Sequence, residues 1–195
     1  MTLSAAERLT STAARLFQEK GLSRVGINEI IREADVARMS LYNNFQSKED
    51  LALAAYTAMS HARREAIDAA TAAAKGPKEA ILAIFDLAES LAQAPSFTGC
   101  SFINLAAHLG DEDERLTDLV RRHKLGLRLQ FEDLVRALGA PDPVILGRQL
   151  LALWDGAIAD SFIENDTAPI RAARDGAARL IEACPPAPDG TNVAK

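Results

Sequence analysis

A set of side chains suited to a phosphate-lined surface lies within the short stretch 38–43. The set consists of Arg38, Met39, Ser40, Tyr42 and Asn43. The arginine and the serine can donate hydrogen bonds to phosphate oxygens, and the tyrosine ring can pack on a sugar while its hydroxyl reaches phosphate. The asparagine can bond a base edge in two places, and the methionine can contact a thymine methyl group. No acidic residue occurs from position 36 to 47, so this composition favours contact with DNA over a merely solvated helical face.

Two short helices must position these side chains. Apolar residues recur at helical spacing over 27–34 and again at Leu41 and Phe45, which predicts helices over 27–34 and 38–45. The segment 35–37 between them is long enough only for a turn, and Asp35 tolerates a left-handed backbone there, although less readily than glycine. Two such helices joined by a tight turn form a helix-turn-helix, whose second helix lies in the major groove of DNA.

The motif carried by the second helix is specific. Ser40-Leu41-Tyr42, two asparagines, Phe45 and then Ser47-Lys48-Glu49 resemble the recognition segment of the TetR family of bacterial transcriptional repressors. The upstream Leu16-Phe17 and Gly21 also fit that pattern, so the resemblance covers roughly residues 5 to 55. The rest of the chain is similar to the family only in its length and helical character.

The resemblance implies a helix-turn-helix DNA-binding domain over 1–46 and a helical ligand-binding and dimerisation domain over 47–184. The DNA contacts that it implies are Gly26, Asn28, Arg38, Met39, Ser40, Tyr42, Asn43 and Lys48. The chain departs from the common pattern in three places: many members have glycine where this chain has Asp35 and where it has Met39, and a hydroxyl residue where it has Val25-Gly26. At Gly26, phosphate contact would therefore fall to the backbone N–H groups of the helix N-terminus.

Composition predicts an all-α protein of about nine helices. Hydrophobic residues make up 48% of the 195-residue chain and aromatic residues only 5%, and no segment alternates convincingly between polar and apolar residues. The net charge of −5 lies wholly outside the first 50 residues, in which basic and acidic side chains balance. A neutral head on an acidic body disfavours nonspecific attraction to DNA, so affinity would depend on a few placed contacts used twice by a symmetric dimer.

Sequence signals for helix ends divide the chain further. The expected helices span about 4–20, 27–34, 38–45, 47–74, 77–94, 101–109, 114–138, 143–162 and 167–184. Ser4 with Glu7 forms a capping box, and Ser47 and Asp142 are N-cap residues. The acidic turn 110–114 suits a helix N-terminus, and residues 185–195, which follow two prolines, are expected to form a disordered tail.

The sequence favours a cytoplasmic protein that is not an enzyme and needs no cofactor or metal. Two cysteines do not make a disulfide framework, and neither a signal peptide nor a membrane-spanning run is present. None of the three histidines has a glutamate three residues before it, which excludes the Glu-x-x-His motif of di-iron bundles. A helical module that binds only protein partners remains the alternative to a DNA-binding regulator.

Two partners besides palindromic double-stranded DNA follow from the resemblance. The last two helices would pair with those of a second copy, through Leu150, Trp154, Ile158, Phe162, Ile170, Ala173, Ala177 and Leu180. A small hydrophobic or aromatic effector would bind the body, and the candidate lining residues are Met59, Phe85, Phe97, Phe102, His108, His123, Phe131 and Trp154. Cys100, at the expected start of a helix that can favour a thiolate, is an alternative sensor of oxidants or electrophiles.

Overall fold

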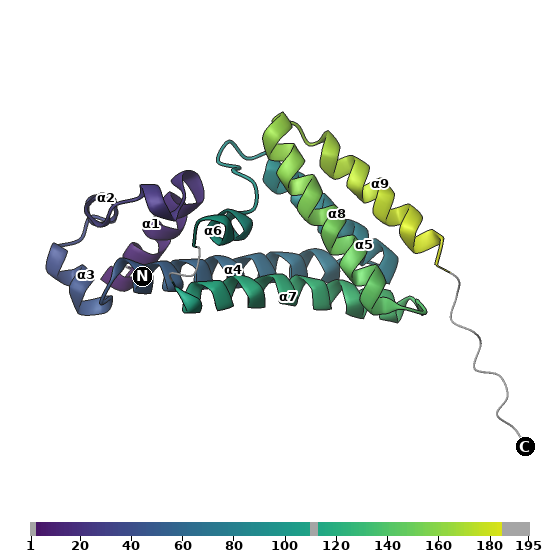
Figure 1. Cartoon of the computed structure of the whole chain (residues 1–195), viewed down its shortest axis with the longest axis horizontal. Coiled ribbons are helices and arrows are strands. Elements are labelled where there is room, and N and C mark those ends of the chain that lie inside the picture. The colour runs from purple at the N-terminus through teal and green to yellow at the C-terminus, as the bar shows by residue number, and fades with distance from the viewer. Residues whose placement is uncertain (1–2, 110–112, 185–195) are drawn as a thin grey trace, which may run out of the picture. The chain divides into compact units, whose positions relative to one another are not determined.

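The computed structural model describes residues 3–109 and 113–184, and within these ranges it contains only helices (Figure 1). The elements are α1 (Ala5–Lys20), a 3₁₀ turn (Leu22–Arg24), α2 (Ile27–Glu33), α3 (Arg38–Asn44), α4 (Lys48–Ala72), α5 (Pro77–Ala92), α6 (Ser101–Leu109), α7 (Glu114–Ala137), α8 (Pro143–Glu164) and α9 (Ala168–Glu182). The predicted all-α class is confirmed for this part of the chain. The expected tail 185–195 and most of the acidic turn, residues 110–112, lie outside it.

The predicted helix caps are present and explain where helices begin. Ser4 and Glu7 exchange hydrogen bonds between side chain and backbone across the first turn of α1. Ser47 Oγ accepts from the backbone N–H of Asp50 at 3.1 Å before α4, and Asp142 Oδ1 accepts from Ile145 N–H at 3.0 Å before α8. Each of these oxygens satisfies an N–H group that the helix itself leaves without a partner.

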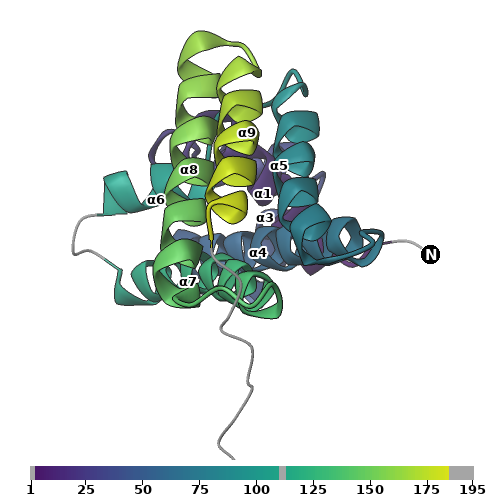
Figure 2. The same ribbon diagram turned by 90° about the vertical axis from the view of Figure 1, so that its right-hand side faces the viewer.

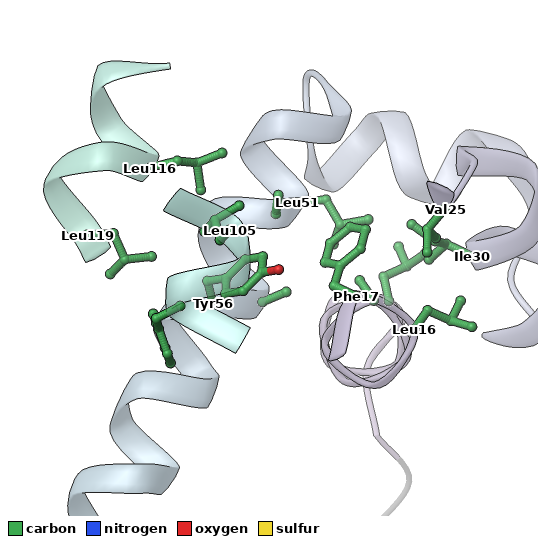
Figure 3. Packing of buried hydrophobic residues seen from close by; sticks show 14 of the residues in the cluster. Leu16, Phe17, Val25, Ile30, Leu51, Tyr56, Leu105, Leu116 and Leu119 are labelled. Carbon is green, nitrogen blue, oxygen red and sulfur yellow. The ribbon is translucent and has the colours of Figure 1, made fainter. Parts of the chain in front are cut away.

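The chain divides into two compact units, and the first comprises Met1–Glu65 and Ala94–Lys124. Its described part contains α1 to α3, the N-terminal portions of α4 and α7, and α6. One continuous apolar cluster fills it and includes Leu41 of α3, and Figure 3 shows labelled side chains of the cluster from α1, α2, α4, α6 and α7. Tyr56 of α4 is its centre: the ring stacks on Phe17 of α1 at 6.0 Å and meets Phe102 of α6 edge-on at 5.7 Å. The helix-turn-helix segment therefore shares its core with α6 and the start of α7.

The second unit comprises Ala66–Gln93 and Leu125–Lys195, and within it α5, α8 and α9 lie side by side (Figures 1 and 2). Phe85 of α5 has ring contacts with Phe131 of α7 at 6.1 Å and with Trp154 of α8 at 5.9 Å. At Gly147, an added Cβ would lie 2.5 Å from Cγ of Glu132, so only glycine permits the close approach of α8 to α7 at this point.

Candidate DNA-recognition site

The turn between α2 and α3 is tight and has a left-handed residue, as the sequence predicts. Asp35 has φ of 50°, a conformation that Asp adopts more readily than most side chains do. Its carbonyl oxygen accepts a 2.8 Å hydrogen bond from Nη2 of Arg8, which ties the turn to α1. Ile30 of α2 and Leu41 of α3 are completely buried, so the inner faces of both short helices are anchored in the core.

The opposite face of α3 projects into solvent. Met39 is 67% exposed and Tyr42 is 48% exposed, although both are large side chains that ordinarily gain free energy from burial. Arg38 and Asn43 are also exposed, and Ser40 is half-buried. A guanidinium, an amide, a phenol and a thioether are thus presented together on one short helix, without a carboxylate among them.

The beginnings of α2 and α3 are joined by a side-chain hydrogen bond, in which Arg38 donates to Oδ1 of Asn28. Asn28 is therefore placed beside the first residue of α3, where both side chains remain exposed. Gly26 is the N-cap of α2 and contributes no side-chain bond to the first N–H groups of that helix, which are the groups predicted to bind a phosphate oxygen. Besides the hydrogen bond from Lys20, a hydrogen bond with the backbone of Gly26 is among the effects that lower the pKa of the nearby Glu29.

Lys48 occupies the first position of α4 and is half-buried. Burial lowers the pKa of its ammonium group, and the neighbouring Glu49 acts in the opposite direction. The direction follows from the cost of holding a charge in partly desolvated surroundings. A phosphate oxygen would offset that cost, which suits the predicted contact.

Contacts from α1 support the site and were not anticipated from sequence. Besides the Arg8 contact, Lys20 Nζ pairs with Oε1 of Glu29 at 2.6 Å, and Arg15 pairs with Glu33. These ion pairs connect α1 to both ends of α2. The charged residues of α1 look like ordinary solvated positions in the sequence, because the partners that α2 supplies become neighbours only through the fold.

The residues predicted to line an effector pocket fall into different units. In the first unit, Met59 is half-buried, while Phe102 stacks on His123 with ring centroids 3.6 Å apart. The hydroxyl of Ser60 lies 2.8 Å from Nδ1 of His123. Burial, followed by the charges of Lys124 and Arg63, lowers the pKa of His123 to about 4, so its ring is neutral at pH 7.

The remaining candidates for the pocket are spread more widely. Phe85, Phe131 and Trp154 belong to the core of the second unit. His108 is exposed on α6 and its Nδ1 contacts the carbonyl oxygen of Asn104 at 2.8 Å. Phe97 is half-buried in the segment before α6. Cys100 is a half-buried free thiol directly before that helix.

The residues predicted to pair two copies pack mostly within one chain. Leu150, Trp154, Ile158, Ile170, Ala173 and Ala177 are all buried, Leu180 is half-buried, and Phe162 is 50% exposed. A different side of α8 is open. Six of its exposed residues lie on one stripe, named here the outer face of α8: Ile145, Gln149, Ala152, Gly156, Ala159 and Ile163. The exposed Arg148 and Asp160 border this stripe. Ile145 and Ile163 are 52% and 76% exposed, so this stripe offers accessible apolar side chains, whereas Phe162 is the one exposed residue among those predicted on α8.

A helix-turn-helix with an exposed polar second helix, in a chain whose described residues form helices and no strands, is typical of a DNA-binding regulator. Residues 9–55 match the model of the family described as "Bacterial regulatory proteins, tetR family". The HTH-type transcriptional regulator LmrA of Bacillus subtilis is 29% identical over 168 residues, which cover 84% of this chain and 89% of that protein.

Solved structures of similar proteins superpose on nearly the whole of this chain. A TetR-family transcriptional regulator from Streptomyces coelicolor superposes with a TM-score of 0.87 at 28% identity and covers 92% of this chain and 95% of its own. A putative regulator of the same kind from Streptomyces avermitilis is 31% identical, has a TM-score of 0.74, and covers 90% and 98%. The chain belongs to the TetR family. This membership favours a DNA-binding transcriptional regulator over a module that binds only proteins.

No helix among 3–109 and 113–184 is long and apolar enough to cross a membrane. Within the same ranges, the structure has no group of three or more histidine, cysteine or acidic side chains arranged to hold a metal ion.

Proposed function

We propose that the protein binds a palindromic operator as a homodimer, represses transcription there, and is released by a small-molecule effector. In this proposal, the outer side of α3 contacts DNA in two adjacent major grooves, centred about 34–36 Å apart. Membership in a family of DNA-binding regulators supports the proposal. It also implies a cytoplasmic protein without catalytic activity, consistent with the composition.

One observation carries the DNA-binding part: the large exposed side chains Met39 and Tyr42 lie on a helix whose opposite side is fixed in the core. A protein that kept these residues only for stability would bury them. Arg38, Tyr42 and Lys48 are assigned to phosphates, and Met39 and Asn43 to base edges.

Dimerisation is assigned to the outer face of α8. Small residues at Ala152, Gly156 and Ala159 let two helices approach closely, and isoleucines flank them at each end. On α8 the charged residues Arg148 and Asp160 lie at the borders of this stripe, whereas the outward side of α9 has Arg171, Asp175 and other charged residues. Two copies that meet through α8 would bury the exposed isoleucines, which are the most costly part of this surface to leave in water.

Fluorescence anisotropy with DNA from upstream of the protein's own gene tests the proposal. The affinity should fall steeply between about 50 and 200 mM salt, because each neutralised phosphate releases a counterion. A scrambled fragment of the same length is the control and should bind much more weakly. Equal binding to both fragments, or binding that does not respond to salt, would refute specific recognition by α3.

A thiol switch at Cys100 is the second candidate for release. The location of the thiol supports this candidate, because the half-buried Cys100 directly precedes α6 and lies near the guanidinium of Arg63. If this switch operates, N-ethylmaleimide should weaken DNA binding of the parent protein but not of Cys100→Ser. Cys184→Ser, which removes the other free thiol, is the matched control and should respond like the parent. An identical response in Cys100→Ser would remove this candidate.

A further inference from the structure

Arg63 lies in the first unit, on α4, three residues after Ser60 and therefore on the same side of the helix. It is half-buried, whereas the adjacent Arg64 is exposed. Among the described residues, the structure gives the Arg63 guanidinium no hydrogen bond and no ion pair. Other arginines of the same unit, such as Arg15 and Arg115, do pair with carboxylates.

The surroundings of Arg63 leave its charge uncompensated. Desolvation is the main effect on this group and lowers its pKa, and only the Cys100 thiol opposes that effect. A thiol is a weak hydrogen-bond acceptor and does not replace a carboxylate. A partly buried cation without a partner carries a free-energy cost, which an anion bound beside it would offset.

The groups near Arg63 come from three helices and include neutral and aromatic side chains, while the charge of Lys124 acts on His123 from the same helix, α7. His123 of α7 is near enough for the charge of Arg63 to act on its ring, and that ring hydrogen-bonds to Ser60 and stacks on Phe102. Because His123 is neutral at pH 7, it adds a hydrogen-bonding group and not a second positive charge. One guanidinium beside an aromatic stack matches a single negative charge on an apolar molecule.

We infer that Arg63, with Ser60, Phe102 and His123, forms the part of the effector site that binds the carboxylate of a monoanionic aromatic or aliphatic acid. The planar guanidinium can donate two parallel hydrogen bonds to the two carboxylate oxygens. The aromatic rings would contact the apolar part of the acid. This assignment rests on the proposed function, in which a small molecule binds the body of the protein and releases it from DNA.

Isothermal titration of the full-length protein with matched pairs of probes tests the charge requirement. The acids are benzoate, phenylacetate and octanoate, and their neutral partners are benzamide, phenylacetamide and octanamide. At least one acid should bind at least tenfold more tightly than its amide. Inorganic phosphate is a further probe, and it should bind more weakly than that acid because a single guanidinium matches a dianion poorly.

Substitutions then locate the charge. Arg63→Met should weaken binding of the acid at least tenfold, and Arg63→Lys should weaken it less because it keeps the charge without the forked geometry. Arg64→Gln, which removes the neighbouring exposed charge, is the matched control and should bind as the parent does. The melting temperature of ligand-free Arg63→Met should equal or exceed that of the parent, because the substitution removes an unpaired charge. A structural arginine would instead leave the variant less stable.

Several results would overturn the inference: no acid binds at millimolar concentration, acids and amides bind equally, phosphate binds most tightly, or Arg63→Met and Arg64→Gln behave alike. Operator binding without ligand, measured on the same samples, separates this failure from that of the proposed function. If the parent protein binds its operator and the acids fail these tests, only the carboxylate site is wrong. If the parent binds no operator DNA, the proposed function itself fails.

Discussion

The helix pairs α2–α3 and α8–α9 have similar turns, but they expose side chains of different polarity. Both the α2–α3 turn and the α8–α9 turn contain a left-handed residue that is not glycine, Asp35 with φ of 50° and Asn165 with φ of 52°. α3 has only seven residues and presents polar groups around Met39 and Tyr42, whereas α8 has 22 residues and presents small and aliphatic side chains. Turn geometry is therefore similar in the two pairs, and we propose that the exposed side chains decide whether the partner is DNA, at α3, or the helix of a second copy, at α8.

Blocking the outer face of α8 should have the largest effect of the substitutions considered. Gly156→Glu should separate the dimer and weaken operator binding at least 100-fold, since a monomer would contact only one half-site. Light scattering gives the mass, and anisotropy gives the affinity. The chain itself should still fold, because no atom lies within 4 Å of a Cβ added at this position.

Ser90→Glu is the control for that experiment, because it adds the same charge to an exposed position of α5 in the same unit. It should leave the mass and the affinity unchanged. A Gly156→Glu protein that stays dimeric would place the pairing surface elsewhere.

Loss of a side chain from α3 should have an intermediate effect on DNA affinity and none on assembly. Tyr42→Ala should weaken binding about tenfold, equivalent to about 1.4 kcal/mol, and by a similar factor on different operator sequences if the ring and hydroxyl contact the backbone. Ile103→Ala removes an exposed apolar side chain from α6 and is expected to have no effect. Equal affinities for the parent and Tyr42→Ala would show that this face does not contact DNA.

The smallest expected effect concerns the two turns. Asp35→Ala and Asn165→Ala should each lower the free energy of unfolding by about 1 kcal/mol, because alanine adopts the left-handed conformation less readily than Asp or Asn. The glycine variants at both positions should stay within about 0.5 kcal/mol of the parent, since glycine has no such preference. Urea denaturation provides the comparison. If alanine and glycine were equivalent at either turn, its left-handed residue would carry no strain.

Local signals in the sequence were sufficient for most helix boundaries. Ser4, Ser47 and Asp142 were predicted as caps, and all three accept the expected backbone hydrogen bonds. Such signals involve residues only three positions apart, so they depend little on the rest of the fold. Asp35 was similarly predicted to tolerate the left-handed turn, which is confirmed.

Local sequence signals could not predict which side of α8 is exposed. Apolar residues occupy both sides of this helix: Leu150 and Trp154 are buried, while Ile145 and Ile163 are exposed. Helical periodicity cannot decide between two apolar sides, because only packing against α5, α7 and α9 selects the inner one. The partly buried, unpaired state of Arg63 could not be predicted for a related reason, because its environment depends on the approach of α6 and α7.

Site-specific photocrosslinking would test most directly the claim that the two pairs have different partners. A benzophenone amino acid would replace Met39 in one protein and Ile163 in another, since both side chains are largely exposed and apolar. With operator DNA present, we predict that the probe at position 39 crosslinks to DNA and the probe at position 163 crosslinks to a second chain. A probe at position 39 that never reaches DNA, or one at position 163 that crosslinks to DNA and not to protein, would contradict the account.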